Sequence, residues 1–131
     1  MRVIEFELPF ALQSLNRRDR THWSQRRKNQ IIMSAEVKAA IGGPRYYPRP
    51  PFQKVRVTID RRSAGILDYD SLWSTPKPLL DALCGPSARH PYGLHIIEDD
   101  KPSLLQLVVT QSKCKRGEGS TFVRIECLDS I

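Results

Sequence analysis

The sequence predicts a single α+β domain in which one mixed sheet of about four strands is covered by helices. Two runs alternate between apolar and polar residues, two further apolar runs have strand character, and helical patterns separate them. The expected order is β-α-β-α-β-β. A length of 131 residues suits one compact domain with its own core.

The first strand and the first helix have regular patterns. Residues 2–8 alternate, with apolar side chains on one face and glutamates on the other, and Pro9 ends the strand. A helix is expected from Thr21 or His22 to Ile41, because apolar residues recur there at spacings of three and four and two glycines follow. The residues between these two elements are expected to form an ordered loop.

The remaining strands are expected at residues 54–61, 104–110 and 121–128. The first alternates strictly and leads into a basic loop at residues 61–65. The other two are expected to pair as a hairpin, whose long tip at residues 111–120 contains two glycines.

The second helical segment, residues 71–83, contains two prolines. Pro76 and Pro78 are not tolerated in a regular helix interior. Either Thr75 caps a short helix with both prolines in its first turn, which we favour, or a helix starting near Asp70 is kinked at the prolines.

The charge distribution favours a polyanionic partner. The formal net charge is +7, and residues 1–62 contain 14 Lys and Arg against 5 Asp and Glu, whereas residues 63–131 contain 7 against 9. A basic half joined to an acidic cluster is common in proteins that bind and process phosphate backbones, although basic surfaces also aid solubility. The basic residues around the first helix are mostly arginine, which favours bidentate phosphate contacts; a solvated helix face is the alternative.

The cysteines and the apolar runs bear on the compartment. Cys84, Cys114 and Cys127 have no CxxC spacing and no histidine at zinc-finger distance, so we interpret them as reduced thiols. No run approaches the about 18 apolar residues of a membrane-spanning helix, and acids interrupt the apolar N-terminal stretch. The expected location is cytoplasmic, with no membrane partner.

Acidic residues gather in the middle of this basic chain. Asp68 and Asp70 are separated by one residue, so their carboxylates point to the same face if the segment is extended. Such a pair offers hard oxygen ligands for Mg²⁺ or Mn²⁺, and one acid of the Asp99–Asp100 pair would complete the site. A metal bound there would activate water for attack on a phosphodiester, and Lys77 would stabilise the developing negative charge.

Each acidic motif also has an ordinary structural explanation. Asp-x-Asp is common in turns and helix caps, and the run of acids at residues 98–100 is typical of a solvated turn. The rival interpretations are a metal-dependent nuclease acting on other branched DNA or on RNA, and a non-catalytic, basic DNA-binding accessory protein. The combination of both motifs in a basic chain favours metal-ion chemistry.

The sequence resembles the RusA family of Holliday junction resolvases in three motifs: DYDSL at 68–72, KPLLDAL at 77–83 and IIEDD at 96–100. An N-terminal strand ending in Leu-Pro, followed by Leu-Asn and His-Trp pairs, is also similar to members of that family. The resemblance covers nearly the whole chain in order and size. The chain departs from the family pattern at Ser71, where Asn is usual, and in a longer spacing between Asp70 and Lys77.

The resemblance implies a small homodimeric α+β endonuclease that uses Mg²⁺ or Mn²⁺ to cut four-way DNA junctions in recombination and repair. Carried over to this chain, Asp68, Asp70 and Asp100 are metal ligands and, with Lys77, the catalytic residues.

Two further sets of residues are expected around such a site. The candidates for DNA contact are Arg17, Arg18, Arg20, His22, Arg26, Arg27, Lys28, Lys113, Lys115 and Arg116. The candidates that would support the catalytic residues are Asn16, Ser71, Asp81 and Asp99.

Overall fold

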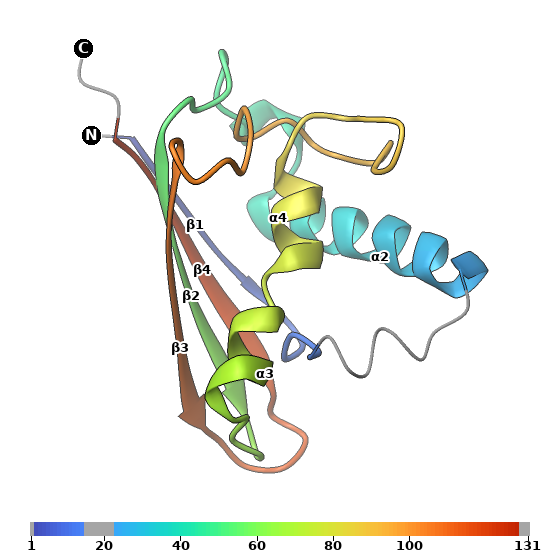
Figure 1. The fold of residues 1–131 in the computed structure, drawn as a ribbon, viewed down its shortest axis with the longest axis vertical. Coiled ribbons are helices and arrows are strands. Elements are labelled where there is room, and N and C mark those ends of the chain that lie inside the picture. Colours follow the sequence, from blue (N-terminus) through green and yellow to red (C-terminus); the bar gives the residue numbers. More distant parts are fainter. Residues whose placement is uncertain (1, 15–22, 129–131) are drawn as a thin grey trace.

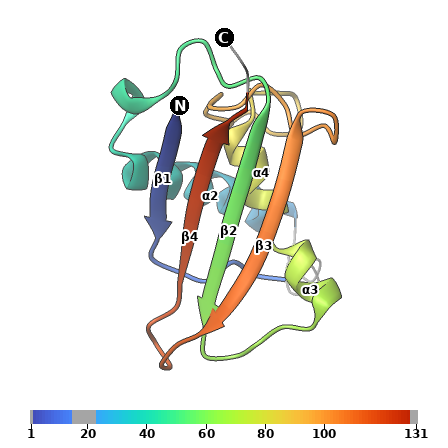
Figure 2. The same ribbon diagram turned by 90° about the vertical axis from the view of Figure 1, so that its left-hand side faces the viewer.

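One mixed sheet, with helices on one of its faces, makes up the fold of this computed structural model, which describes residues 2–14 and 23–128 (Figure 1). The strands are β1 (Val3–Leu8), β2 (Val55–Ser63), β3 (Leu105–Lys113) and β4 (Ser120–Cys127). Their order in the sheet is β1-β4-β2-β3, as Figure 2 shows. The prediction of a single α+β domain with a mixed four-stranded sheet is confirmed.

The pairing of β3 with β4 was predicted wrongly. β2 lies between them, parallel to β3 and antiparallel to β4, and the connection at residues 114–119 passes from one side of β2 to the other. Because β2 and β3 are parallel, their connection must cross back along the sheet, and it does so through helices. Val57 faces Ile125 on one side and Leu107 on the other, so β2 is an interior, apolar strand of the sheet.

The basic loop expected at residues 61–65 is largely strand. β2 continues to Ser63, and the Arg61 side chain is buried beneath it. Its guanidinium donates to the backbone carbonyls of Leu12 at 2.8 Å and Gly65 at 3.2 Å. Burial lowers the pKa of Arg61. This arginine therefore ties the strand to the segment after β1 and is not available to a ligand.

Helix α2 (Trp23–Ile41) ends where the sequence predicts. The backbone amides of both following glycines donate to the carbonyl of Lys38 at 3.1 Å, and Gly42 has a φ of 104°, which a side chain would disfavour. Val37 is buried against the sheet, whereas Ile31 is exposed. The expected start of this helix, at Thr21 or His22, lies outside the described residues.

The second helical segment, predicted as one helix, is two short helices, α3 (Tyr69–Ser74) and α4 (Lys77–Leu83). The break falls at Thr75, whose backbone amide and hydroxyl both bond back to the carbonyl of Leu72. Pro76 rather than Thr75 is the N-cap of α4, and Pro78 occupies its first turn, where a missing N–H costs nothing. A short 3₁₀ helix, η1 (Pro44–Tyr46), follows α2.

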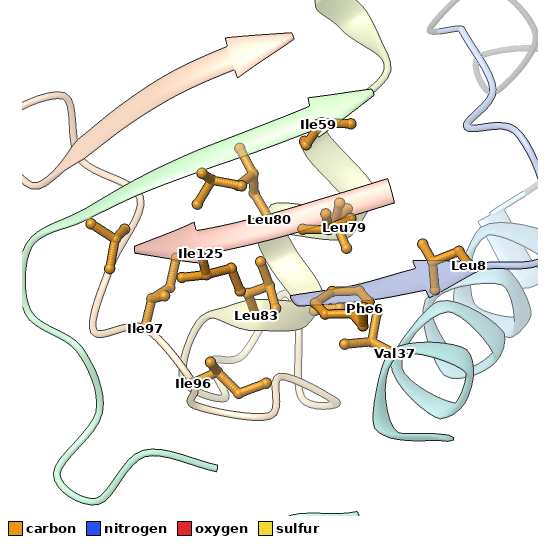
Figure 3. Packing of buried hydrophobic residues seen from close by; sticks show 14 of the residues in the cluster. Phe6, Leu8, Val37, Ile59, Leu79, Leu80, Leu83, Ile96, Ile97 and Ile125 are labelled. Carbon is orange, nitrogen blue, oxygen red and sulfur yellow. The ribbon is translucent and has the colours of Figure 1, made fainter. Parts of the chain in front are cut away.

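The core lies between the sheet and the pair α2 and α4 (Figure 3). Phe6 and Ile125 from the sheet pack with Val37 from α2 and with Leu79 and Leu83 from α4. Burial of these side chains fixes α4 on the sheet. The polar positions of α4 are consequently held in one orientation.

No helix within residues 2–14 and 23–128 combines the length and the apolar composition that a membrane span requires.

Candidate metal and phosphate site

The first pair of predicted ligands lies at the start of α3. Asp68 is the N-cap residue, with its Oδ1 accepting from the backbone amide of Ser71 at 2.8 Å, and Asp70 is in the first turn. The Ser71 amide lowers the pKa of Asp68. The two aspartates therefore do not project from one extended strand, which corrects the geometry expected from their spacing. Both are exposed.

Helix α4 presents Lys77 and Asp81 on one face. They are four residues apart, and the Lys77 Nζ lies 3.0 Å from the Asp81 Oδ1. Leu79, Leu80 and Leu83 occupy the opposite face in the core. The apolar pattern of α4 thus determines where its two charged residues point.

Asp100 reaches the same place from a distant part of the chain. The preceding Ile96 and Ile97 are fully buried, and their backbone amides donate to the carbonyl of Leu83 at 2.8 and 3.1 Å. A bridge to Phe52 continues the anchoring up to Glu98. The acidic run begins where this buried anchor ends.

The structure therefore joins two of the predicted catalytic residues. Lys77 Nζ donates to Asp100 Oδ2 at 3.2 Å. Partial burial lowers the pKa of Lys77, but its contacts with Asp81 and Asp100 outweigh that effect, so the net shift is upward. Lys77 is consequently a cation near neutral pH and suited to stabilise negative charge rather than to accept a proton.

An open pocket of about 290 Å³ surrounds this ion pair. Its lining residues are Lys77, Asp81, Cys84, Gly85, Ser87, His90, Glu98, Asp99 and Asp100. Ligand atoms of Cys84, Asp99 and Asp100 lie within 4.8 Å of one another. Within residues 2–14 and 23–128, no such group includes Asp68 or Asp70.

Cys84 and His90 at this pocket were not singled out from the sequence. Burial, with the charges of Asp100, Asp81 and Asp99, raises the pKa of Cys84 to about 12, so its thiol is protonated. His90 lies 3.4 Å from Asp81, in a loop folded back on α4. A Cβ on Gly93 would meet the Cys84 carbonyl oxygen at 2.3 Å, so only glycine permits this return. No spacing in the sequence indicates either neighbour.

The described candidates for DNA contact lie on exposed surfaces. Arg26, Arg27 and Lys28 are in the first turns of α2, and the Arg27 guanidinium lies 5.9 Å from the centre of the Tyr92 ring. Lys113, Lys115 and Arg116 lie at the end of β3 and in its connection to β4, at the same end of the sheet as α3 (Figure 1). Five predicted residues are outside the described part of the chain: Asn16, Arg17, Arg18, Arg20 and His22.

The residues expected to support the catalytic residues lie in two places, the start of α3 and the acidic pocket. The backbone amide of Ser71 donates to Asp68 at the start of α3, whereas Asp81 and Asp99 line the pocket.

Comparison with models of protein families gives no match, and neither does comparison with curated protein sequences.

Proposed function

We propose that this protein is a Mg²⁺- or Mn²⁺-dependent, structure-selective DNA endonuclease that resolves Holliday junctions in recombination and repair and acts as a homodimer. The observation that supports this most is the position of Lys77, held 3.2 Å from Asp100 in an open acidic pocket. These two residues are 23 positions apart in sequence and belong to two of the three motifs that resemble the RusA family.

Lys77 has the charge that phosphoryl transfer needs. Attack on a phosphodiester places additional negative charge on the phosphoryl oxygens and on the leaving oxygen. An ammonium group held by Asp81 and Asp100 is already oriented before substrate arrives, so little reorganisation is needed. Its exposed side chain remains accessible to a backbone phosphate.

The carboxylates of the pocket fit a hard divalent cation. Mg²⁺ is typically bound by one or two carboxylates together with water and substrate phosphate, and Asp99 and Asp100 offer these oxygens. The Cys84 thiol is protonated and too soft to favour Mg²⁺. When bound, the metal would supply Lewis-acid activation of water. The resemblance makes Asp68 and Asp70 further ligands, although the structure places them at the start of α3, outside the group formed by Cys84, Asp99 and Asp100.

The basic surface provides the affinity for DNA. Arginines on the first turns of α2 and the basic residues after β3 would contact phosphates without reading sequence. Net charge of +7 supports attraction to a polyanion.

The test is cleavage of a synthetic four-way junction with and without Mg²⁺, with Asp70→Asn as the variant. We expect metal-dependent cleavage by the wild type and none by Asp70→Asn, while junction binding by the variant is kept or strengthened because a like charge near phosphate is removed. An unchanged cleavage rate for Asp70→Asn would refute the assignment. Rates on flap, duplex and RNA substrates separate a junction resolvase from a nuclease of other selectivity.

One observation favours a second candidate, a non-catalytic DNA-binding accessory protein. Asp68 already has a complete structural role as the N-cap of α3. In that case the acids serve as caps and ion-pair partners only. Titration with Mg²⁺ would then change neither the thermal stability of the protein nor its action on DNA. An endonuclease instead requires that Mg²⁺ bind, which changes the thermal stability, and that it activate cleavage.

A further inference from the structure

The imidazole of His90 connects α2 to the acidic pocket. Gln30 Nε2 lies 3.1 Å from the His90 Nδ1, and the His90 Nε2 lies 3.4 Å from the Asp81 Oδ2. Both ring nitrogens therefore face a polar partner, one on each helix. The side chains of His90 and Asp81 are largely shielded, with 33% and 14% of their surfaces exposed.

These partners select one tautomer of the ring. With the amide nitrogen of Gln30 at this position, Nδ1 accepts from it and the proton of the neutral imidazole lies on Nε2. That nitrogen lies 3.4 Å from a carboxylate oxygen of Asp81, a close approach that is electrostatically favourable for both groups.

The two oxygens of Asp81 have separate neighbours. Oδ2 faces His90, and Oδ1 lies 3.0 Å from Lys77, whose ammonium also reaches Asp100. Fixing one oxygen restricts the rotation of the whole carboxylate. The position of the ammonium is thereby linked, through Asp81, to a side chain on α2.

We propose that His90 is a positioning residue for Lys77. Supported by Gln30, it holds Asp81 in the orientation that keeps the Lys77 ammonium beside Asp100. The kinetic part of this inference rests on the proposed endonuclease function, whereas the tautomer and the restraint on Lys77 do not.

The first test is spectroscopic and uses the wild-type protein without substrate. Long-range ¹H–¹⁵N correlation of the histidine rings at pH 8 should show His90 as the single Nε2–H tautomer. The Lys77 ¹³Cε resonance should move in His90→Asn, whose side chain is too short to reach both partners, and stay in place in His95→Asn. His95 is the matched control because it contacts Glu98 instead. A Nδ1–H or averaged tautomer for His90, or an unmoved Lys77 signal in His90→Asn, would overturn the proposal.

The second test is kinetic and uses the same variants on the four-way junction. We expect His90→Asn to lower kcat about tenfold at unchanged Kd for the junction, as loss of an orienting partner typically does. His90→Gln, which keeps an N–H donor for Asp81, should recover most of the rate, and His95→Asn should match the wild type. Circular dichroism identifies any variant that does not fold. A wild-type kcat for folded His90→Asn contradicts the inference. If the wild type itself cleaves nothing, the endonuclease assignment fails and the spectra alone decide the role of His90.

Discussion

The start of α3 and the start of α4 both present charged side chains, but they stabilise them by different means. At α3, Asp68 is satisfied within its own turn by the amide of Ser71. At α4, Lys77 contacts both Asp81 and Asp100, and a buried anchor brings Asp100 from another part of the chain. The first arrangement needs four consecutive residues, 68–71; the second needs the whole fold.

This difference separates a structural role from a candidate functional one. The presence of a capping carboxylate is accounted for by its role in starting the helix. A cation shared between two acids at the rim of an open pocket contributes little to stability when its side chain is 61% exposed. The α4 cluster is therefore the place where chemistry, rather than helix formation, is the better explanation for the charges.

The largest expected effect comes from removing the anchor of the acidic run. Ile97→Ala should lower the free energy of unfolding by about 2–5 kcal/mol, because the side chain is fully buried and leaves a cavity. Urea denaturation measures this loss. Ile66→Ala, at an exposed position before α3, should change stability by no more than about 0.5 kcal/mol. Equal losses of stability in the two variants would show that the buried Ile97 does not anchor the acidic run.

Removing the shared cation tests the α4 cluster directly. Lys77→Met keeps the aliphatic stem and should lower kcat on a four-way junction by about 10²–10³-fold, since a preorganised charge at the reacting phosphate is lost. Single-turnover cleavage measures it. Lys101→Met is the control, because Lys101 pairs with Asp99, at 3.7 Å, rather than with Asp100. Similar losses in both variants would point to general electrostatics instead.

The arginines in the first turns of α2 should affect the binding of DNA and not the rate of its cleavage. Arg26→Ala with Arg27→Ala should weaken junction binding and reduce the slope of log K against log salt by about 2, one phosphate contact for each arginine. Fluorescence anisotropy at several salt concentrations gives the slope. The double variant Arg45→Ala with Arg49→Ala removes the same charge from the proline-rich segment and should leave the slope nearly unchanged. A binding constant that does not change with salt concentration would exclude phosphate contacts by the arginines of α2.

Cys84 reports the burial of its thiol and the negative potential of the pocket. Its pKa is raised to about 12 from 9.0, so the folded protein holds the proton more tightly than the unfolded chain. The stability that this thiol contributes is fully present below pH 9.0 and is lost as the pH rises toward about 12. At pH 8.5, iodoacetamide should modify Cys84 slowly in the folded protein and rapidly in urea, as mass spectrometry can measure. Fast modification of folded Cys84 would contradict this picture of the pocket.

The smallest effect is expected at Asp68, where two substitutions distinguish a cap from a ligand. Asp68→Ala should lower thermal stability, and Asp68→Asn should retain it because Asn also caps helices well. The Ser71 amide lowers the pKa of Asp68, so its contribution is present above pH 3.8 and is lost as the pH falls through the lower, folded value. Thermal unfolding at pH 7 and pH 3 measures both. If Asp68 also binds metal, Asp68→Asn loses cleavage at unchanged stability.

Local pattern was sufficient for much of the fold. Alternation located β1 and β2, and the glycines after Ile41 located the end of α2. The neighbour of β4 could not be predicted in this way, because nothing in residues 114–119 indicates that they pass across β2. The same limit applied to the site. Lys77 and Asp100 were joined through motifs, whereas His90 approaches Asp81 only because Gly93 permits the loop to fold back.

The pairing of β1 with β4 has a consequence for synthesis on the ribosome. Val3 faces Glu126, so one edge of the sheet cannot close until β4 has left the exit tunnel. The residues of the pocket, from Lys77 to Asp100, emerge well before that moment, when the surface beneath α4 is still incomplete. Contacts between residues so distant in sequence form slowly. The acidic pocket would therefore acquire its final shape only after β4 has emerged and paired with β1.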